Sequence, residues 1–200
     1  MIVNLSQQHS LISNWVSELR NVDIQNDRMR FRRNLERIGE VAAYEISKLL
    51  PFEEKEIQTP LGIAVHKILK EQPVLATILR AGLPLHNGIL NYFDQADNAF
   101  ISAYRKHNKD GSFEISLDYV SCPELENRVI IISDPMLATG SSLVKTIHYL
   151  KEEGKSYDNR WMHRPVINWK KNDLRKTEGT IEQRVFSETK KLISIRRKLE

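Results

Sequence analysis

Apolar side chains recur at helical intervals between residues 27 and 50. They are three or four residues apart, the spacing that places side chains on one face of an α-helix. Asp27 precedes this pattern as a candidate N-cap, and Pro51 ends it. We therefore predict a long amphipathic helix over residues 27–50. Its buried face would hold Phe31, Leu35, Ile38, Ala42, Ile46 and Leu49.

Short apolar runs alternate with helical patterns over the next hundred residues. The run Val129–Ile132 holds four β-branched residues, which pack well on a pleated sheet. This alternation favours an α/β fold, in which a mostly parallel sheet is flanked by helices. We predict strands over Val74–Leu79, Ala99–Tyr104 and Val129–Ile132, and helices over Leu83–Tyr92 and Ser142–Glu153, the second closed by Gly154.

A tight-turn signal, Asp110-Gly111, lies between two extended stretches, around Ala103–His107 and Phe113–Val120. This pattern predicts a β-arm with a short turn at its tip. We expect the arm to contact a second copy of the chain, as a homodimer or a higher homo-oligomer.

The pattern of buried strands is lost after Gly154. A further buried strand is expected there, and the best candidate is the two-residue apolar step Val166-Ile167. Residues 181–199 resemble a basic helix, which would not complete a parallel sheet. We therefore divide the chain into a core at 1–154, with an N-terminal helical part, and an atypical segment at 155–200, where the fold is incomplete.

Charge changes in the same region. Residues 160–200 hold twelve basic and five acidic residues, a net of +7, which leaves −3 for residues 1–159 of a total of +4. A shift of this kind marks either a solvated basic surface or a nucleic-acid-binding patch, and we favour the first. The coincidence with the lost apolar pattern suggests that the last segment derives from a reading-frame change or a divergent replacement.

The composition excludes several classes of protein. Of the 200 residues, 40% are hydrophobic and 28% charged, as in an ordinary soluble domain. No apolar run approaches the ~20 residues that span a bilayer, and Met1–Ser10 does not resemble a signal peptide. The single cysteine, Cys122, excludes an intrachain disulfide and a cysteine-cluster metal site. The histidines show no metal-ligand spacing, and we expect a cytoplasmic protein without a metal held by its own side chains.

The stretch from Val129 to Ser142 carries the clearest chemical signal. A predicted strand leads into Asp134, then a Thr-Gly-Ser-Ser turn, then a helix. Gly140 lets the backbone approach a ligand closely, and free N–H groups at the start of the helix attract phosphate. Asp134 can accept hydrogen bonds from sugar hydroxyls. The stretch is therefore typical of a site for a phosphorylated sugar, and it matches neither a Walker A loop nor a dinucleotide fingerprint.

These residues also carry a family resemblance. The run Asp-Pro-Met-Leu-Ala-Thr-Gly at 134–140 resembles the phosphoribosyl-pyrophosphate (PRPP) signature of type I phosphoribosyltransferases, in the form found in uracil phosphoribosyltransferases. The segment Ile78–Leu83 is similar to that family's pyrophosphate-side loop, and Tyr104-Arg105 is similar to its second arginine. The resemblance covers roughly residues 10–155, with three motifs in the family's order.

The resemblance implies a fold, a reaction and a set of residues. The fold is that of a type I phosphoribosyltransferase, and the reaction converts uracil and PRPP to UMP and pyrophosphate, with Mg²⁺ bound mainly through PRPP. Asp134 would hold ribose hydroxyls and, with Arg105, serve in catalysis. Residues 136–142 would hold the 5′-phosphate, and Arg80 and Arg105 would face the pyrophosphate. The implied PRPP-binding set is Arg80, Arg105, Asp134, Pro135, Met136, Leu137, Ala138, Thr139, Gly140, Ser141 and Ser142.

The chain departs from the family pattern at Pro84, Asn87 and Ser141, and most of all in its last segment. The family's uracil pocket uses a glycine-rich C-terminal sequence, and nothing in Lys155–Glu200 resembles it, so the uracil-binding residues stay unassigned. Three hypotheses follow: a uracil phosphoribosyltransferase, a PRPP-binding protein without transferase activity, and a nucleic-acid-binding regulatory relative. Some relatives also use GTP as an allosteric effector.

Overall fold

The computed structural model describes residues 4–5, 9–107, 113–136 and 140–153. Helix α3 separates strands β3 and β4, and helix α4 follows β6, in the order that the apolar pattern predicts. In chain order the elements are α1 (Leu11–Arg20), α2 (Arg28–Ser47), β1 (Phe52–Thr59), β2 (Gly62–Leu69), β3 (Val74–Leu79), α3 (Leu83–Leu90), β4 (Asp97–His107), β5 (Phe113–Ser121), β6 (Ile130–Ser133) and α4 (Ser141–Glu153).

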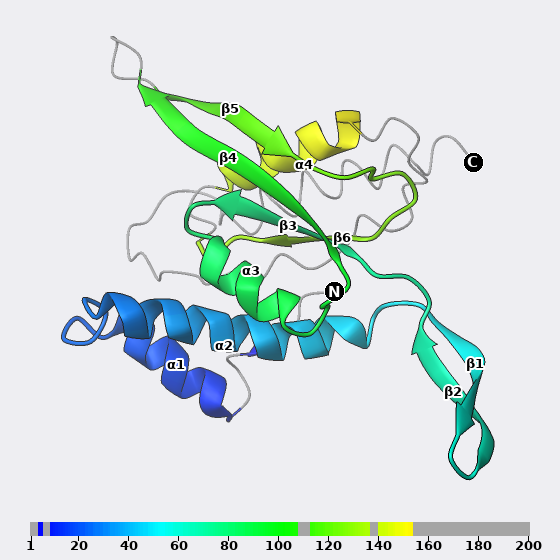
Figure 1. Ribbon diagram of the computed structural model, residues 1–200. Helices are drawn as coiled ribbons and strands as arrows, with labels where there is room; N and C mark the ends of the chain where they lie inside the picture. The colour runs from blue at the N-terminus through cyan, green and yellow to red at the C-terminus, as the bar shows by residue number, and fades with distance from the viewer. Residues whose placement is uncertain (1–3, 6–8, 108–112, 137–139, 154–200) are drawn as a thin grey trace.

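A four-stranded sheet forms the centre of the molecule, in the order β5-β4-β3-β6 (Figure 1). Strand β3 pairs in parallel with both β4 and β6, whereas β4 and β5 are antiparallel. The predicted α/β fold with a mostly parallel sheet is thus confirmed. Strand β3 has the predicted bounds, whereas β4 begins two residues earlier than predicted and extends to His107.

Alternate residues of β3 and β6 enter two separate cores, because side chains of a strand point to opposite faces. Val74, Ala76 and Ile78 pack with Leu143 and Leu150 of α4. On the other face, Leu75 and Ile131 pack with residues of α2 and α3. The sheet is therefore covered by α4 on one side and by α3 and α2 on the other, as Figure 1 shows. Burial on both faces explains the continuous apolar runs.

Helix α2 confirms the predicted N-cap but is shorter than the predicted range 27–50. The Asp27 carboxylate accepts hydrogen bonds from the backbone N–H groups of Met29 and Arg30, at 3.1 and 3.0 Å. These bonds satisfy two of the donors that a helix start leaves unpaired. The helix ends at Ser47, so the prediction was three residues too long at its C-terminus.

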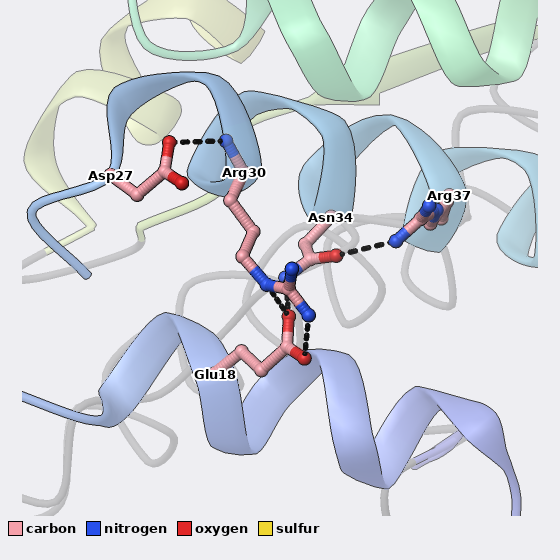
Figure 2. A network of polar contacts seen from close by, with 5 residues as sticks. All are labelled: Glu18, Asp27, Arg30, Asn34 and Arg37. Atoms are coloured by element: carbon pink, nitrogen blue, oxygen red, sulfur yellow. Dashed lines mark hydrogen bonds and ion pairs between the residues drawn. The ribbon is translucent and has the colours of Figure 1, made fainter. Parts of the chain in front are cut away.

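A polar network attaches helix α1 to α2 (Figure 2). Helix α1 is not among the predicted helices. The guanidinium of Arg30 donates two hydrogen bonds to the Glu18 carboxylate, at 2.8 and 2.6 Å, and the Asn34 amide donates a third at 2.7 Å. Arg37 donates to the side-chain oxygen Oδ1 of Asn34, and its guanidinium lies over the ring of Trp15. These contacts lower the pKa of Glu18 to about 2, chiefly through its hydrogen bond with Arg30.

Helices α2 and α3 cross with their backbones in contact. A side chain at Gly88 of α3 would place its Cβ 2.0 Å from the carbonyl oxygen of Glu36, and one at Gly39 of α2 would lie 2.3 Å from the carbonyl oxygen of Leu85. Glycine at both positions therefore sets the separation of the two helices. Since α3 follows the β3 loop directly, this crossing also positions that loop.

Strands β1 and β2 form an antiparallel hairpin that projects from the body of the molecule (Figure 1). The apolar pattern predicts no strands over these residues. In β1 most positions are charged or polar, and six of its eight residues are exposed. The apolar alternation that signals a half-buried strand is therefore weak in this hairpin.

The predicted β-arm is confirmed, because strands β4 and β5 pair in antiparallel fashion. Their pairing runs from Phe100↔Ser121 to His107↔Phe113, with a register shift at Ser102/Ala103. The Asp110-Gly111 turn lies outside the described residues. So do Gly154, Val166-Ile167 and the predicted helix over 181–199, which stay predictions.

In the part of the chain that the structure describes, no helix combines the length and apolar character needed to cross a membrane.

Candidate active site

Two of the predicted site residues, Arg80 and Asp134, lie on loops at one edge of the sheet. Strands β3 and β6 are parallel neighbours, so their carboxyl ends face the same way. The loop with Arg80 follows β3, and the loop with Asp134 follows β6. Ligands of open α/β sheets bind at this edge. The structure therefore brings together two loops whose residues Arg80 and Asp134 are 54 positions apart in the sequence.

Asp134 stands at the carboxyl end of β6 and is 9% exposed. Burial raises the pKa of its carboxyl group, and a hydrogen bond from the backbone N–H of Met136 lowers it in part. That bond reaches Oδ1 at 3.2 Å, and among the described residues Oδ2 has no donor. A carboxylate with one oxygen bound to its own loop and the other unpaired suits the recognition of ligand hydroxyls.

Helix α4 begins at this edge, as predicted for the phosphate loop. Gly140 has a φ of 73° and precedes the helix. Its carbonyl oxygen accepts the first helical hydrogen bond, from the N–H of Val144 at 2.9 Å. The positive φ explains glycine at this position, because other residues rarely adopt it. Leu137, Ala138 and Thr139 lie outside the described residues, and their predicted phosphate contacts stay predictions.

Arg80 is exposed directly after β3. Within the described ranges its guanidinium has no ion pair or hydrogen bond. A free guanidinium at the ligand edge of the sheet can bind phosphate oxygens in pairs. This placement suits the predicted role of Arg80 toward pyrophosphate.

Arg105 lies near the end of strand β4, within the predicted β-arm. The last residue of β4 that pairs with β3 is Ser102, opposite Leu79. Arg105 is three residues beyond it, about 10 Å along the strand, where it pairs with Ile115 of β5. It therefore belongs to the β-arm rather than to the sheet edge, and its role in catalysis stays a prediction.

Three residues outside the predicted binding set join the two loops. Thr77 and Ser133 are the final registered pair of β3 and β6, and both are buried. Gly82, in the loop after β3, lies directly against them. Each hydroxyl interrupts an otherwise apolar strand, a signal that could have singled out both residues.

The Asp134 carboxylate suits a cation that binds together with a phosphorylated ligand. Within the described part of the chain, no cluster of three or more histidine, cysteine, aspartate or glutamate residues could hold a metal ion. Mg²⁺ usually keeps several waters and binds through one or two carboxylates and substrate phosphates. Asp134, at the edge where phosphate would bind, supplies one such carboxylate. The donor set therefore fits Mg²⁺ held mainly by a phosphorylated substrate.

The chain is similar to known proteins in sequence and in fold. A uracil phosphoribosyltransferase of Porphyromonas gingivalis is 54% identical over 142 residues, which cover 71% of this chain and 66% of that protein. One of Methanothermobacter thermautotrophicus is 38% identical over 130 residues, covering 64% and 60%. The chain thus spans less than two thirds of the length of these curated relatives.

A solved structure, that of the AQ2163 protein from Aquifex aeolicus, superposes with a TM-score of 0.65 at 31% identity, covering 76% of this chain and 71% of that one. The family model described as "Uracil phosphoribosyltransferase" matches residues 6–159. The chain therefore belongs to the uracil phosphoribosyltransferase family.

Proposed function

We propose that the chain transfers the 5-phosphoribosyl group of PRPP to uracil, which yields UMP and pyrophosphate. The observation that carries this proposal is the pairing of β3 and β6, which places the Arg80 loop beside the Asp134 loop at one sheet edge. The loops at this edge carry the buried Asp134 carboxylate and the exposed Arg80 guanidinium, and helix α4 begins after the second loop. Membership of the uracil phosphoribosyltransferase family supports uracil as the acceptor.

The proposed chemistry needs no protein nucleophile. As the bond from C1′ to the pyrophosphate oxygen lengthens, positive charge develops on the ribose ring and negative charge on the leaving group. Arg80 stabilises the leaving pyrophosphate, with Arg105 as its second contact. Asp134 orients the ribose through its hydroxyls and lies on the side of the developing positive charge. The start of α4, after Gly140, holds the 5′-phosphate.

Binding then aligns the acceptor. Holding N1 of uracil in line with C1′ removes much of the entropic barrier to the reaction. Mg²⁺, when bound with PRPP, neutralises charge on the pyrophosphate. Asp134 is the described residue best placed to contact the cation or its waters.

A second candidate function is a PRPP-binding protein without transferase activity. The observation that favours it is the extent of the similarity, which covers 66% and 60% of these two relatives and leaves the remainder of each unmatched. The uracil-binding residues are unassigned, and the segment 155–200 has no recognisable acceptor site. Under this alternative, PRPP binds and no UMP is formed.

One assay separates these functions. The full-length chain is mixed with PRPP, Mg²⁺ and labelled uracil, and UMP is followed, while PRPP binding is measured by calorimetry. Formation of UMP supports the transferase, and binding without UMP supports the second candidate. The variant Asp134→Asn serves as control, because any genuine turnover must fall when the ribose contact is lost. Failure of the chain to bind PRPP contradicts both proposals.

We further propose that the arm formed by β4 and β5 takes part in a homodimer or a higher homo-oligomer, that GTP acts as an allosteric effector, and that the protein is cytoplasmic. Light scattering at micromolar concentration tests the first point, and a monomer would contradict it. Adding GTP to the UMP assay tests the second. Salt-dependent RNA affinity would instead support a nucleic-acid-binding role for the basic segment 155–200.

A further inference from the structure

We infer that Thr77 and Ser133 are positioning residues, whose buried hydroxyls hold the Arg80 loop and the Asp134 loop at a fixed separation. The kinetic part of this inference rests on the proposed function. The structural part concerns the free chain and does not depend on it.

The two hydroxyls link the ends of neighbouring strands. Thr77 and Ser133 are the last registered pair of β3 and β6, and beyond them β3 pairs only with β4. The Thr77 hydroxyl donates to the Ser133 carbonyl oxygen at 3.4 Å, and the Ser133 hydroxyl donates to the Ala76 carbonyl oxygen at 3.3 Å. Both bonds cross between the strands where the ladder ends. They therefore extend the pairing to the point from which the two loops leave.

Burial makes these long hydrogen bonds significant. Thr77 is 0% exposed and Ser133 is 1% exposed, so neither hydroxyl can exchange its partner for water. A buried hydroxyl without a partner is disfavoured, which ties each side chain to the opposite strand. Two such groups on adjacent strands that are otherwise apolar indicate a position where polar contacts specify the separation of the strands.

The loop after β3 lies directly on this pair. A Cβ at Gly82 would stand 2.3 Å from the Thr77 hydroxyl oxygen and 2.8 Å from the Ser133 carbonyl oxygen. The backbone of Gly82 therefore contacts both strand ends at once. Its N–H donates to the Ile78 carbonyl oxygen at 3.0 Å, and its own carbonyl oxygen accepts from the N–H of His86 in α3, at 2.9 Å. The loop with Arg80 is thus fixed against the strand that presents Asp134.

The consequence is a defined spacing between a guanidinium and a carboxylate that contact opposite parts of one ligand. Displacements near 1 Å reduce catalysis substantially, because the reacting atoms lose alignment. Loss of the hydroxyl pair lets the strand ends separate, and we expect weaker contact with both the pyrophosphate and the ribose.

The test compares Thr77→Val, which keeps a similar shape and removes the hydroxyl, with Thr77→Ser, which keeps the hydroxyl. Thr146→Val is the matched control, since Thr146 is also 0% exposed but its hydroxyl has no partner among the residues described. For a hydrogen bond of ordinary net strength, we expect T77V to raise the KM for PRPP about three- to tenfold. The KM for uracil should stay within about twofold, T77S should restore binding, and T146V should behave as wild type.

Amide hydrogen exchange of the free chain supplies a readout that does not need activity. The N–H groups of Gly82 and Met136 should exchange faster in T77V than in T146V, because the loops on both strands loosen. Unchanged exchange at both amides, or equal changes in T77V and T146V, overturns the inference. Faster exchange in a chain that fails to bind PRPP upholds the positioning role and overturns the proposed function, so the two failures are distinguishable.

Discussion

The crossing of α2 and α3 gives the sharpest stability prediction, because two physical effects oppose each other in sign. Replacing Gly88 by alanine in an unconstrained helix stabilises it by about 1 kcal/mol through helix propensity. Here the added Cβ would lie 2.0 Å from the carbonyl oxygen of Glu36 and 3.0 Å from the backbone nitrogen of Glu40. These are backbone atoms of a neighbouring helix, which cannot rotate away as a side-chain tip can.

The helices must therefore separate by about 1 Å to admit the methyl group, and overpacking of this kind destabilises by about 1–3 kcal/mol. Leu85 and Ile89 of α3 are each 1% exposed and would lose contacts with α2 as the helices part. Because the clash is with backbone atoms and also costs core contacts, the upper part of that range applies. After the gain in helix propensity is subtracted, we expect the free energy of unfolding to fall by about 2 kcal/mol. In a protein of this size that loss lowers Tm by about 4–8 °C.

Thermal unfolding followed by circular dichroism measures this change. Asn87→Ala is the matched control, because Asn87 neighbours Gly88 on α3 but is exposed, so its replacement should shift Tm little. Gly39→Ala, which approaches the same crossing from α2, should destabilise as Gly88→Ala does. A Tm for Gly88→Ala equal to or above that of wild type would refute the reasoning, since it would mean that propensity outweighs the backbone contact.

Two further predictions concern charge. Burial raises the pKa of Asp134 above its unfolded value, so its contribution to stability is greatest below the unfolded pKa and is lost as pH rises through the folded pKa. Asp134→Asn should therefore raise the Tm of the free chain at pH 7, more than at pH 4, and should lower UMP formation. A lower Tm of this variant at pH 7 would contradict the prediction. Glu18 shows the opposite sign, with a folded pKa of about 2 against an ordinary value of 4.5. The contribution of Glu18 to stability is present above pH 4.5 and is lost between about pH 4.5 and 2. In an acid titration, the Tm difference between wild type and Glu18→Gln should therefore disappear over that interval. A Tm difference that stays constant would exclude the Arg30 contact as its cause.

Local patterns were sufficient for the elements that carry the chemistry. The apolar run of β3, the β-branched run of β6 and the Asp27 cap each depend on neighbouring residues, and the structure has all three. The helix after Gly140 also follows from adjacent residues, because a positive φ and a free helix start are local properties. Helix α1 has apolar residues at helical spacing, with Ile12 and Leu19 buried, and could have been found in the same way.

Contacts between distant segments could not be read in this manner. The hairpin of β1 and β2 is largely exposed, so burial left little periodic signal in its sequence. Arg105 lies in the stretch predicted as one side of the β-arm, but only the structure shows which residue of β5 it pairs with, Ile115.

The sequence alone determined the alternation of strands and helices, the two loops that carry Arg80 and Asp134, and membership of a phosphoribosyltransferase fold, because these depend on residues close together in the chain. Only the tertiary structure decided that Thr77, Ser133 and Gly82 hold those loops together. That arrangement depends on which strands are neighbours and on the distance between their backbones, and the packing of the whole sheet sets both.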